Sequence, residues 1–269
     1  MSEIFDRFEA LADQSKNKVG VGVGERSVDL LRGIERARCY AHIVLVGAEE
    51  IEGWDLIIAN EPEKKLVELL MNGTVDALVR GTVSARKALQ VLKERAGLRR
   101  IRRAALLSTA QGNEFFLTPV GIDEGNSISE QVYLVTKTAE LLDSLGITPK
   151  VGVLSGGRAE DKGRARAVDR TLKRAEQLTR RLSAAALDTT NYGILIEDAV
   201  LSSNVLVAPD GISGNLIFRT LTLLGGGKGH GAPLLGIPYT FVDTSRSGSA
   251  FGDAIIVASA LSHLRHTYC

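Results

Sequence analysis

Three polar, glycine-containing segments carry the residue types that bind anions, and each follows a run of apolar residues. Residues 80–86 read RGTVSAR, residues 209–215 read PDGISGN and residues 243–249 read DTSRSGS. A segment that joins a strand to a helix presents unpaired backbone N–H groups at the helix start, where a phosphate or carboxylate binds. The three segments therefore predict a site for an anionic ligand.

The predicted ligand-binding residues combine hydroxyl, amide, carboxylate and guanidinium groups with glycines that let a ligand approach the backbone. They are Arg80, Thr82, Ser84, Asp210, Gly211, Ser213, Gly214, Asn215 and Ser247. A solvated helix start explains segment 80–86 equally well, and a capped turn explains segment 209–215. Position along the chain does not decide between these interpretations.

Ser245, Arg246 and Asp253 are the residues that we predict to be catalytic. A guanidinium in a loop of serine and glycine makes a two-pronged contact with phosphate or carboxylate, so Arg246 is predicted to hold the ligand's charge. Asp253 lies on the next predicted helix, where it could act as a general base or orient one. A polar surface turn with an exposed ion pair is the alternative interpretation.

Four other motifs are more typical of structure than of chemistry. The alternation of glycine and valine in residues 20–24 favours a strand with one small face over a cofactor-binding turn. Residues 225–231, which include His230, favour a connector over a lid, and the basic side of helix 163–183 favours a solvated face over a binding surface. The histidines and cysteine of residues 263–269 favour an exposed tail, so no metal site is predicted.

Strand-like and helix-like stretches alternate along the chain and would position these segments. Strands are predicted at 18–23, 42–47, 54–59, 74–80, 103–108, 114–118, 150–154, 204–208 and 238–243. Helices are predicted at 3–14, 26–39, 84–96, 127–145, 163–183, 215–224 and 251–264, and between Asn60, predicted as an N-cap, and Gly73. Ser127 and Glu130 form a predicted capping box. The alternation predicts an α/β fold with largely parallel sheets.

The composition excludes several classes of partner. The 269 residues carry 33 basic and 32 acidic side chains, a balance that argues against nucleic acid. No apolar run approaches the roughly 20 residues of a membrane helix, and the N-terminus lacks the pattern of a signal peptide. Cys39 and Cys269 lie far apart in the sequence. We therefore expect free thiols and a cytoplasmic protein with no membrane partner.

The order and spacing of these segments resemble the phosphate acetyl/butyryltransferase family along nearly the whole chain. Residues 202–249 are similar to the family signature NVLIFPDLNTGN…GPILQGLNKPVNDLSRG, and VDALVRGTV is similar to ADALMKGLV. The resemblance implies a two-lobed fold like that of isocitrate and isopropylmalate dehydrogenases, with a cleft between the domains and usually a homodimer. Residues 1–126 with 243–269 would form the first domain and 127–242 the second.

Members of that family transfer an acyl group between coenzyme A and phosphate. The resemblance implies that Ser245 and Arg246 match the family's Ser-Arg pair, with Arg246 holding phosphate, and that Asp253 helps to deprotonate the thiol. Asp210, Gly214 and Asn215 match a loop of the family's cleft. The match is imperfect, because Asp253 comes one residue late, which turns it by about 100° on a helix.

A divergent branch of the family, the Mtx X-subunit type of methanogenic archaea, is a closer resemblance, carried by SGGRAEDKGRARAVDRTLKRAEQL. It implies a transferase-like protein of methanogenesis, labelled a methyltransferase subunit, that binds an anionic or coenzyme-type substrate. The cofactor stays open, with coenzyme A and a phosphate-like anion as the candidates, and other methyltransferase subunits are candidate partners. An active phosphate acyltransferase and a binding or regulatory subunit that has lost catalysis are the alternatives.

Overall fold

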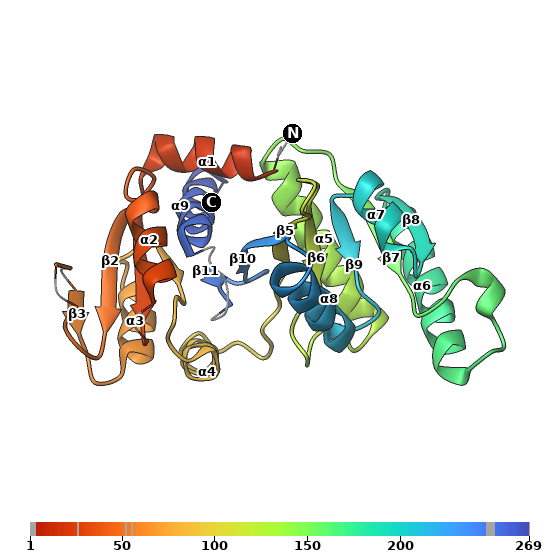
Figure 1. Cartoon of the computed structure of the whole chain (residues 1–269), viewed down its shortest axis with the longest axis horizontal. Coiled ribbons are helices and arrows are strands. Elements are labelled where there is room, and N and C mark those ends of the chain that lie inside the picture. The colour runs from red at the N-terminus through yellow and green to blue at the C-terminus, as the bar shows by residue number, and fades with distance from the viewer. Residues whose placement is uncertain (1–3, 26, 52, 55, 246–250, 269) are drawn as a thin grey trace. The chain divides into compact units, whose positions relative to one another are not determined.

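The computed structural model describes residues 4–25, 27–51, 53–54, 56–245 and 251–268. The chain is an α/β protein with mostly parallel strands, which confirms the predicted fold class (Figure 1). It forms two compact units. Unit 1 contains Ile4 and residues 102–228, and unit 2 contains residues 5–101 and those from 229 onward. The chain thus passes between units near residues 101 and 228, whereas the resemblance predicts these passages near 126 and 242.

The strands of unit 2 follow the order β3-β2-β1-β4-β11-β10. Their bounds are β1 (Lys18–Val23), β2 (His42–Gly47), β3 (Leu56–Ile58), β4 (Ala77–Val79), β10 (Lys228–Pro233) and β11 (Thr240–Asp243). Neighbours are parallel except β10, which runs antiparallel to β11 with Ala232 opposite Asp243. The carboxyl ends of β1, β4 and β11 therefore lie along one edge, where open α/β sheets bind ligands.

Two pairs of helices pack on the strands of unit 2, which also contains α1. The helices are α1 (Ile4–Ser15), α2 (Val28–Ala37), α3 (Pro62–Met71), α4 (Ala85–Arg95) and α9 (Phe251–Tyr268). Helix α3 packs on α4, and α2 packs on α9, which also contacts β1, β4 and β11. A Cβ atom on Gly33 would lie 2.6 Å from the backbone nitrogen of Gly252, so the backbones of α2 and α9 touch.

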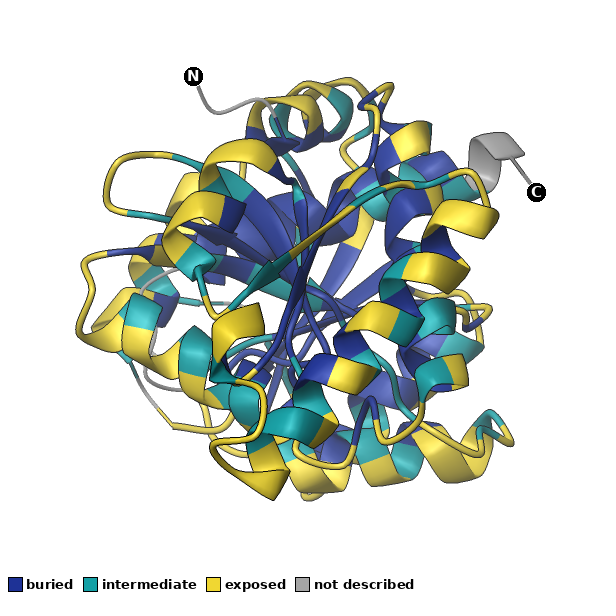
Figure 2. Cartoon of the chain, turned by 90° about the vertical axis from the view of Figure 1, so that its right-hand side faces the viewer, coloured by how far each residue is buried: buried dark blue, intermediate teal, exposed yellow. Residues whose placement is uncertain are grey.

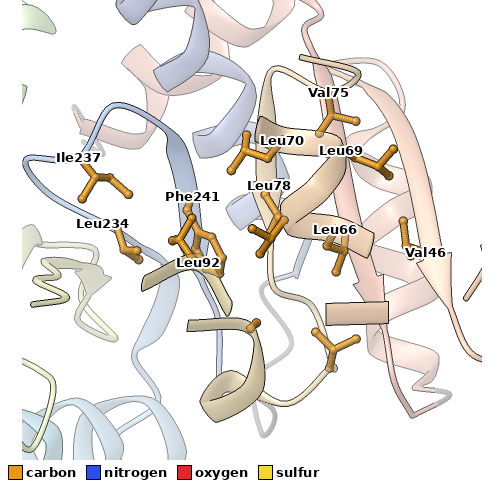
Figure 3. Packing of buried hydrophobic residues seen from close by; sticks show 13 residues of the cluster. Val46, Leu66, Leu69, Leu70, Val75, Leu78, Leu92, Leu234, Ile237 and Phe241 are labelled. Carbon is orange, nitrogen blue, oxygen red and sulfur yellow. The ribbon is translucent and has the colours of Figure 1, made fainter. Parts of the chain in front are cut away.

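An apolar cluster fills the space between α3, α4 and the strands beside them (Figure 3). Its labelled members are Val46, Leu66, Leu69, Leu70, Val75, Leu78, Leu92, Leu234, Ile237 and Phe241. Each is buried, and full burial of one such side chain contributes about 1.5–3 kcal/mol. The cluster therefore stabilises the strands whose ends carry the polar segments of unit 2.

The strands of unit 1 follow the order β5-β6-β9-β7-β8. Its strands are β5 (Ala105–Ser108), β6 (Glu114–Thr118), β7 (Lys150–Leu154), β8 (Asp188–Gly193) and β9 (Val205–Val207). Its helices are α5 (Ile128–Ser144), the 3₁₀ turn η1 (Ala159–Asp161), α6 (Arg166–Ala184), α7 (Ile196–Ser202) and α8 (Gly211–Leu223). In Figure 2, strands in the middle of the view are mostly dark blue, whereas the surrounding helices alternate between dark blue and yellow, as amphipathic helices do.

Some predicted element boundaries are wrong. The N-cap of α3 is Glu61, not Asn60, and its side chain makes no capping hydrogen bond. Residues 211–215 form the first turns of α8 instead of a loop, and residues 228–233 form a strand instead of a connector. Among the described residues, no helix is both long and apolar enough to cross a bilayer.

Candidate functional site

Arg80, directly after β4, is a buried residue that ties two strand ends together. Its side chain donates from Nε to Oδ1 of Asp243, the last residue of β11, at 2.5 Å. One terminal nitrogen donates to the carbonyl oxygens of Gly81 and Val83 at 3.1 and 3.0 Å. Arg80 is only 3% exposed, so these contacts fix the turn after β4 against the end of β11.

Threonine hydroxyls complete the connection between the ends of β1, β4 and β11. The hydroxyl of Thr82 accepts from the backbone N–H groups of Gly24 and Glu25 at 2.9 and 3.2 Å and donates to the carbonyl of Glu25 at 3.0 Å. The hydroxyl of Thr244 donates to the carbonyl of Gly81 at 2.9 Å. Segments that are far apart in the sequence are thus joined by buried or half-buried hydrogen bonds.

Ser84 ends this turn as the N-cap of α4. Its hydroxyl accepts from the backbone N–H of Lys87 at 3.4 Å, and its own N–H donates to the carboxylate of Glu63 at 3.1 Å. We call Gly24, Glu25, Arg80–Ser84 and Asp243–Ser245 the strand-end cluster. The structure therefore brings the predicted residues Arg80, Thr82, Ser84 and Ser245 to one edge of unit 2.

Asp253, in the first turn of α9, forms a buried pair with His230 of β10. Its Oδ2 lies 2.7 Å from Nδ1 of His230, and both residues are 5% exposed. Its Oδ1 accepts a hydrogen bond from Arg36 of α2. The ring of Phe5 lies against the imidazole, with ring centroids 4.7 Å apart. Both carboxylate oxygens of Asp253 are therefore engaged within unit 2.

Arg36 links this buried pair to the surface. Its side chain is about half exposed and also donates to Glu9 of α1 at 3.1 Å. Burial alone lowers the pKa of Arg36, but the carboxylates of Asp253 and Glu9 outweigh that effect and raise it. Arg36 therefore remains a cation where it lies against the side chain of Asp253.

The predicted segment 209–215 lies in unit 1, where its residues hold α8 against a neighbouring loop. Asp210 caps α8 by accepting from the N–H of Ser213 at 2.8 Å. A Cβ atom on Gly211 would lie 1.7 Å from the carbonyl oxygen of Gly121, and one on Gly214 would lie 1.8 Å from that of Pro119. These glycines are required by close packing of one backbone on another.

Polar side chains hold the same loops through hydrogen bonds to backbone carbonyls. Asn215 donates to the carbonyl of Val120 at 3.0 Å, and Gln131 donates to the carbonyls of residues 208 and 209. Arg174 of α6 donates to Gln131 at 2.9 Å and to the carbonyl of Gly125. Burial lowers the pKa of Arg174, although the carboxylate of Asp210 acts against this. Arg174 thus supports the loops from within, on a helix expected to present a solvated basic face.

A buried ion pair stabilises the loop that follows β6. Glu124 is 2% exposed, and its Oε1 accepts from Nε of Arg103 at 2.7 Å. Burial raises the pKa of Glu124, and the Arg103 guanidinium offsets only part of that effect. The Glu124 carboxylate therefore stabilises the loop through Arg103, although burial disfavours its ionised form.

The remaining predicted residues lie at and after the end of β11 and at the end of the chain. Arg246, Ser247 and Cys269 lie outside the described residues, and Ser245 is half-buried directly after Thr244. In the part of the chain that the structure describes, no group of three or more His, Cys, Asp or Glu residues could hold a metal ion. Residues 18–23 form strand β1, which confirms the structural interpretation of the glycines there.

Sequence reasoning missed the partners of Asp253. In the sequence, His230 is only part of a predicted glycine-rich connector, and Arg36 lies on an ordinary amphipathic helix. The one available signal was a single histidine in a segment otherwise made of glycine and lysine. Its pairing with Asp253 depends on β10 lying next to β11, which no local pattern indicates.

The fold is that of the phosphotransacylases. The structure of the branched-chain phosphotransacylase from Enterococcus faecalis V583 has a TM-score of 0.67 at 20% identity, covering 91% of this chain and 99% of that chain. At this identity the likeness establishes the fold alone. No family model matches the sequence.

Relatives of known sequence define the family more closely. A Methanosarcina mazei protein named "Putative methyltransferase mtx subunit X" is 49% identical over 271 residues, covering 98% of this chain and 97% of that protein. A Methanocaldococcus jannaschii protein named as an uncharacterized methyltransferase is 34% identical over 237 residues, covering 85% of this chain and 91% of that protein. The chain belongs to the mtx subunit X family.

Proposed function

We propose that the chain is a transferase that binds the anionic group of its substrate at the strand-end cluster of unit 2. The observation that carries this proposal is the Arg80–Asp243 pair, which locks the ends of β4 and β11 at the edge where parallel sheets bind ligands. Arg80 is a positioning residue in this proposal. Ser245 and the residues that follow it, Arg246 and Ser247, would contact the ligand.

The substrate would carry a phosphate, a coenzyme or a methyl group. The relatives' names favour methyl transfer, and the phosphotransacylase fold favours acyl transfer between coenzyme A and phosphate. A pre-positioned anion site would orient a charged substrate in either reaction, and neither reaction requires a covalent bond to the protein.

Calorimetric titration with inorganic phosphate and with coenzyme A tests this site. Hydrogen bonds to a charged group contribute about 1.5–3 kcal/mol, so Arg246→Ala should weaken binding by roughly one to two orders of magnitude. Ser202→Ala, an exposed hydroxyl on α7 of unit 1, is the matched control and should bind as the wild type does. Equal affinity of Arg246→Ala and the wild type would refute the assignment.

A binding or regulatory subunit without catalysis is the second candidate. The observation that favours it is that Asp253, the expected base, already has both oxygens engaged by Arg36 and His230. Purified chain that transfers an acyl or methyl group with turnover would exclude this candidate. An inactive chain that gains activity only with other methyltransferase subunits would support it.

We also propose that the chain forms a homodimer in a cytoplasmic setting. Helix α8 exposes Ile212 and Leu216, and its C-cap residue Leu224 is exposed as well. Apolar side chains gathered on one surface are typical of protein–protein contact sites. Light scattering on the eluted peak of a sizing column gives the mass directly, and a monomeric mass at working concentration would refute this proposal.

A further inference from the structure

Strand β8 forms an open edge of the strands of unit 1. It is the last strand in their order, and residues 188–191 pair in regular register with residues 150–153 of β7. Every second residue of an edge strand directs its backbone N–H and C=O groups away from the sheet, where another extended chain can pair with them. Proteins often protect such edges with lysine or proline, but β8 contains neither, and none of its residues is buried. The edge therefore offers a template for a further strand.

Different helices cover the two faces of the sheet beside β8. Strands β7, β8 and β9 are parallel, and β7 lies between the other two. Helix α6 connects β7 to β8, and α7 leads back from β8 to β9 (Figure 1). Right-handed crossovers that run in opposite directions across a sheet place their helices on opposite faces, and both helices contact β8. A chain added to β8 would therefore direct alternate side chains toward α6 and toward α7.

The α6 side of this edge is hollow and carries positive charge. A groove of about 860 Å³ lies between the 3₁₀ turn η1, α6 and the carboxyl end of β8. Four basic and three acidic side chains line it, the basic ones being Arg158, Lys162, Lys173 and Arg180. Residues 158–181 hold nine basic and four acidic side chains, although the charges of the whole chain nearly balance. Carboxylates of an added strand would therefore be attracted to this side.

The α7 side of the same edge is apolar and acidic. Ile194, directly after β8, is 50% exposed, and Leu201 of α7 is 70% exposed. Glu197 and Asp198, in the first turn of α7, are exposed as well. Carboxylates on this side would meet like charges, whereas apolar side chains would find apolar surface to cover.

We propose that the β8 edge and the groove beside it bind an extended segment of a partner protein in which acidic residues alternate with apolar ones. The segment pairs with β8 through backbone hydrogen bonds, and its carboxylates enter the groove. A second copy of this chain fits poorly, because an antiparallel pair of β8 strands related by a twofold axis would place two basic α6 helices on the same face. The edge belongs to unit 1, so it can be tested independently of the anion site proposed for unit 2.

The probe is the acetylated and amidated peptide EVEVEVE, titrated calorimetrically into the full chain. We expect it to bind at least about tenfold more tightly than KVKVKVK, because the groove repels lysine. The peptide EEEEVVV has the same composition without the alternation, and it should bind more weakly than EVEVEVE by a similar factor. Equal affinity for EVEVEVE and either of the other peptides would overturn the proposal.

Backbone methylation separates strand addition from general adhesion. In an extended EVEVEVE chain, the N–H groups of the glutamates point to one edge and those of the valines to the other. Methylation of the nitrogens that face β8 should abolish binding, and methylation of the other set should leave it unchanged. If both methylated peptides bind equally, or if neither binds, the segment does not add to β8 as a strand.

Two pairs of substitutions on α6 test the groove. Lys173→Gln with Arg180→Gln removes two lining cations, and loss of two exposed ion pairs predicts binding weaker by about 2–30-fold. Arg170→Gln with Arg181→Gln removes two exposed cations that do not line the groove, and this control should bind within about twofold of the wild type. Matching circular dichroism spectra and melting curves establish that both variants fold. An equal loss in both variants would overturn the role of the groove.

Amide hydrogen exchange locates the bound peptide. EVEVEVE should slow exchange in residues 188–191, because an added strand shields and bonds the open edge. Protection that leaves these residues unchanged would overturn the assignment. A dimer that protects them without peptide would assign the edge to a second copy of the chain instead.

Discussion

Removal of the Arg80 guanidinium should destabilise unit 2 strongly. Arg80→Met keeps most of the buried side-chain volume but leaves the Asp243 carboxylate without its cation and the carbonyls of Gly81 and Val83 without their donor. Removing one partner of a buried pair costs about 3–5 kcal/mol, because the other charge remains buried. The unfolding equilibrium should shift by roughly two to three and a half orders of magnitude.

Urea unfolding followed by circular dichroism measures this loss. Arg86→Met changes an exposed arginine on α4 of the same unit and should stay within about 0.5 kcal/mol of the wild type. The double variant Arg80→Met with Asp243→Asn should recover part of the loss, since no charge is then left buried. If Arg80→Met unfolds within about 1 kcal/mol of the wild type, the pair is not what fixes the strand ends.

Two further perturbations test unit 1. Gly214→Ala would place a Cβ atom 1.8 Å from the carbonyl oxygen of Pro119, and overpacking of this kind lowers the free energy of unfolding by about 1–3 kcal/mol, despite the better helix propensity of alanine. The variant should therefore melt at a lower temperature than the wild type. Thr220→Ala, exposed on the same helix, is the control, and equal melting of Gly214→Ala and the wild type would contradict the contact. Because burial raises the pKa of Glu124, the native state keeps a proton that the unfolded chain has already lost. The free energy of unfolding should therefore fall as pH rises from the ordinary carboxyl range through that raised pKa. Glu124→Gln should lack this fall, and an identical pH slope in both proteins would refute the assignment.

Apolar patterning predicted the buried strands well and the exposed ones poorly. Strands β1, β2, β6 and β7 have the bounds expected from their valine, leucine and phenylalanine runs. Strand β8 reads DTTNYG, lies at the end of the strand order and is largely exposed, so its sequence carries no alternation of apolar residues. Strand β10, with its glycines and proline, is defined by its pairing with β11 and not by its own composition.

The sequence located the polar segments of unit 2 correctly but could not assign their contacts. Arg80 and Asp243 are 163 positions apart, and no sequence pattern near either residue indicates that their side chains pair. Reasoning from residue types treats each polar side chain as a ligand donor, whereas a folded chain must first satisfy its own buried polar groups. For Arg80 and Thr82 that requirement is already met by the protein, and the same holds for Asp210.

The way the chain divides has a consequence for its synthesis. Unit 1 is built almost entirely from one continuous stretch, residues 102–228, so it can fold as soon as that stretch has left the ribosome. Unit 2 cannot complete its fold at that stage, because β11 lies between β4 and β10 and is synthesised some 160 residues after β4. Until then β1, β2 and β4 expose apolar faces and an open strand edge, so the nascent amino-terminal third is the part that most needs protection from aggregation.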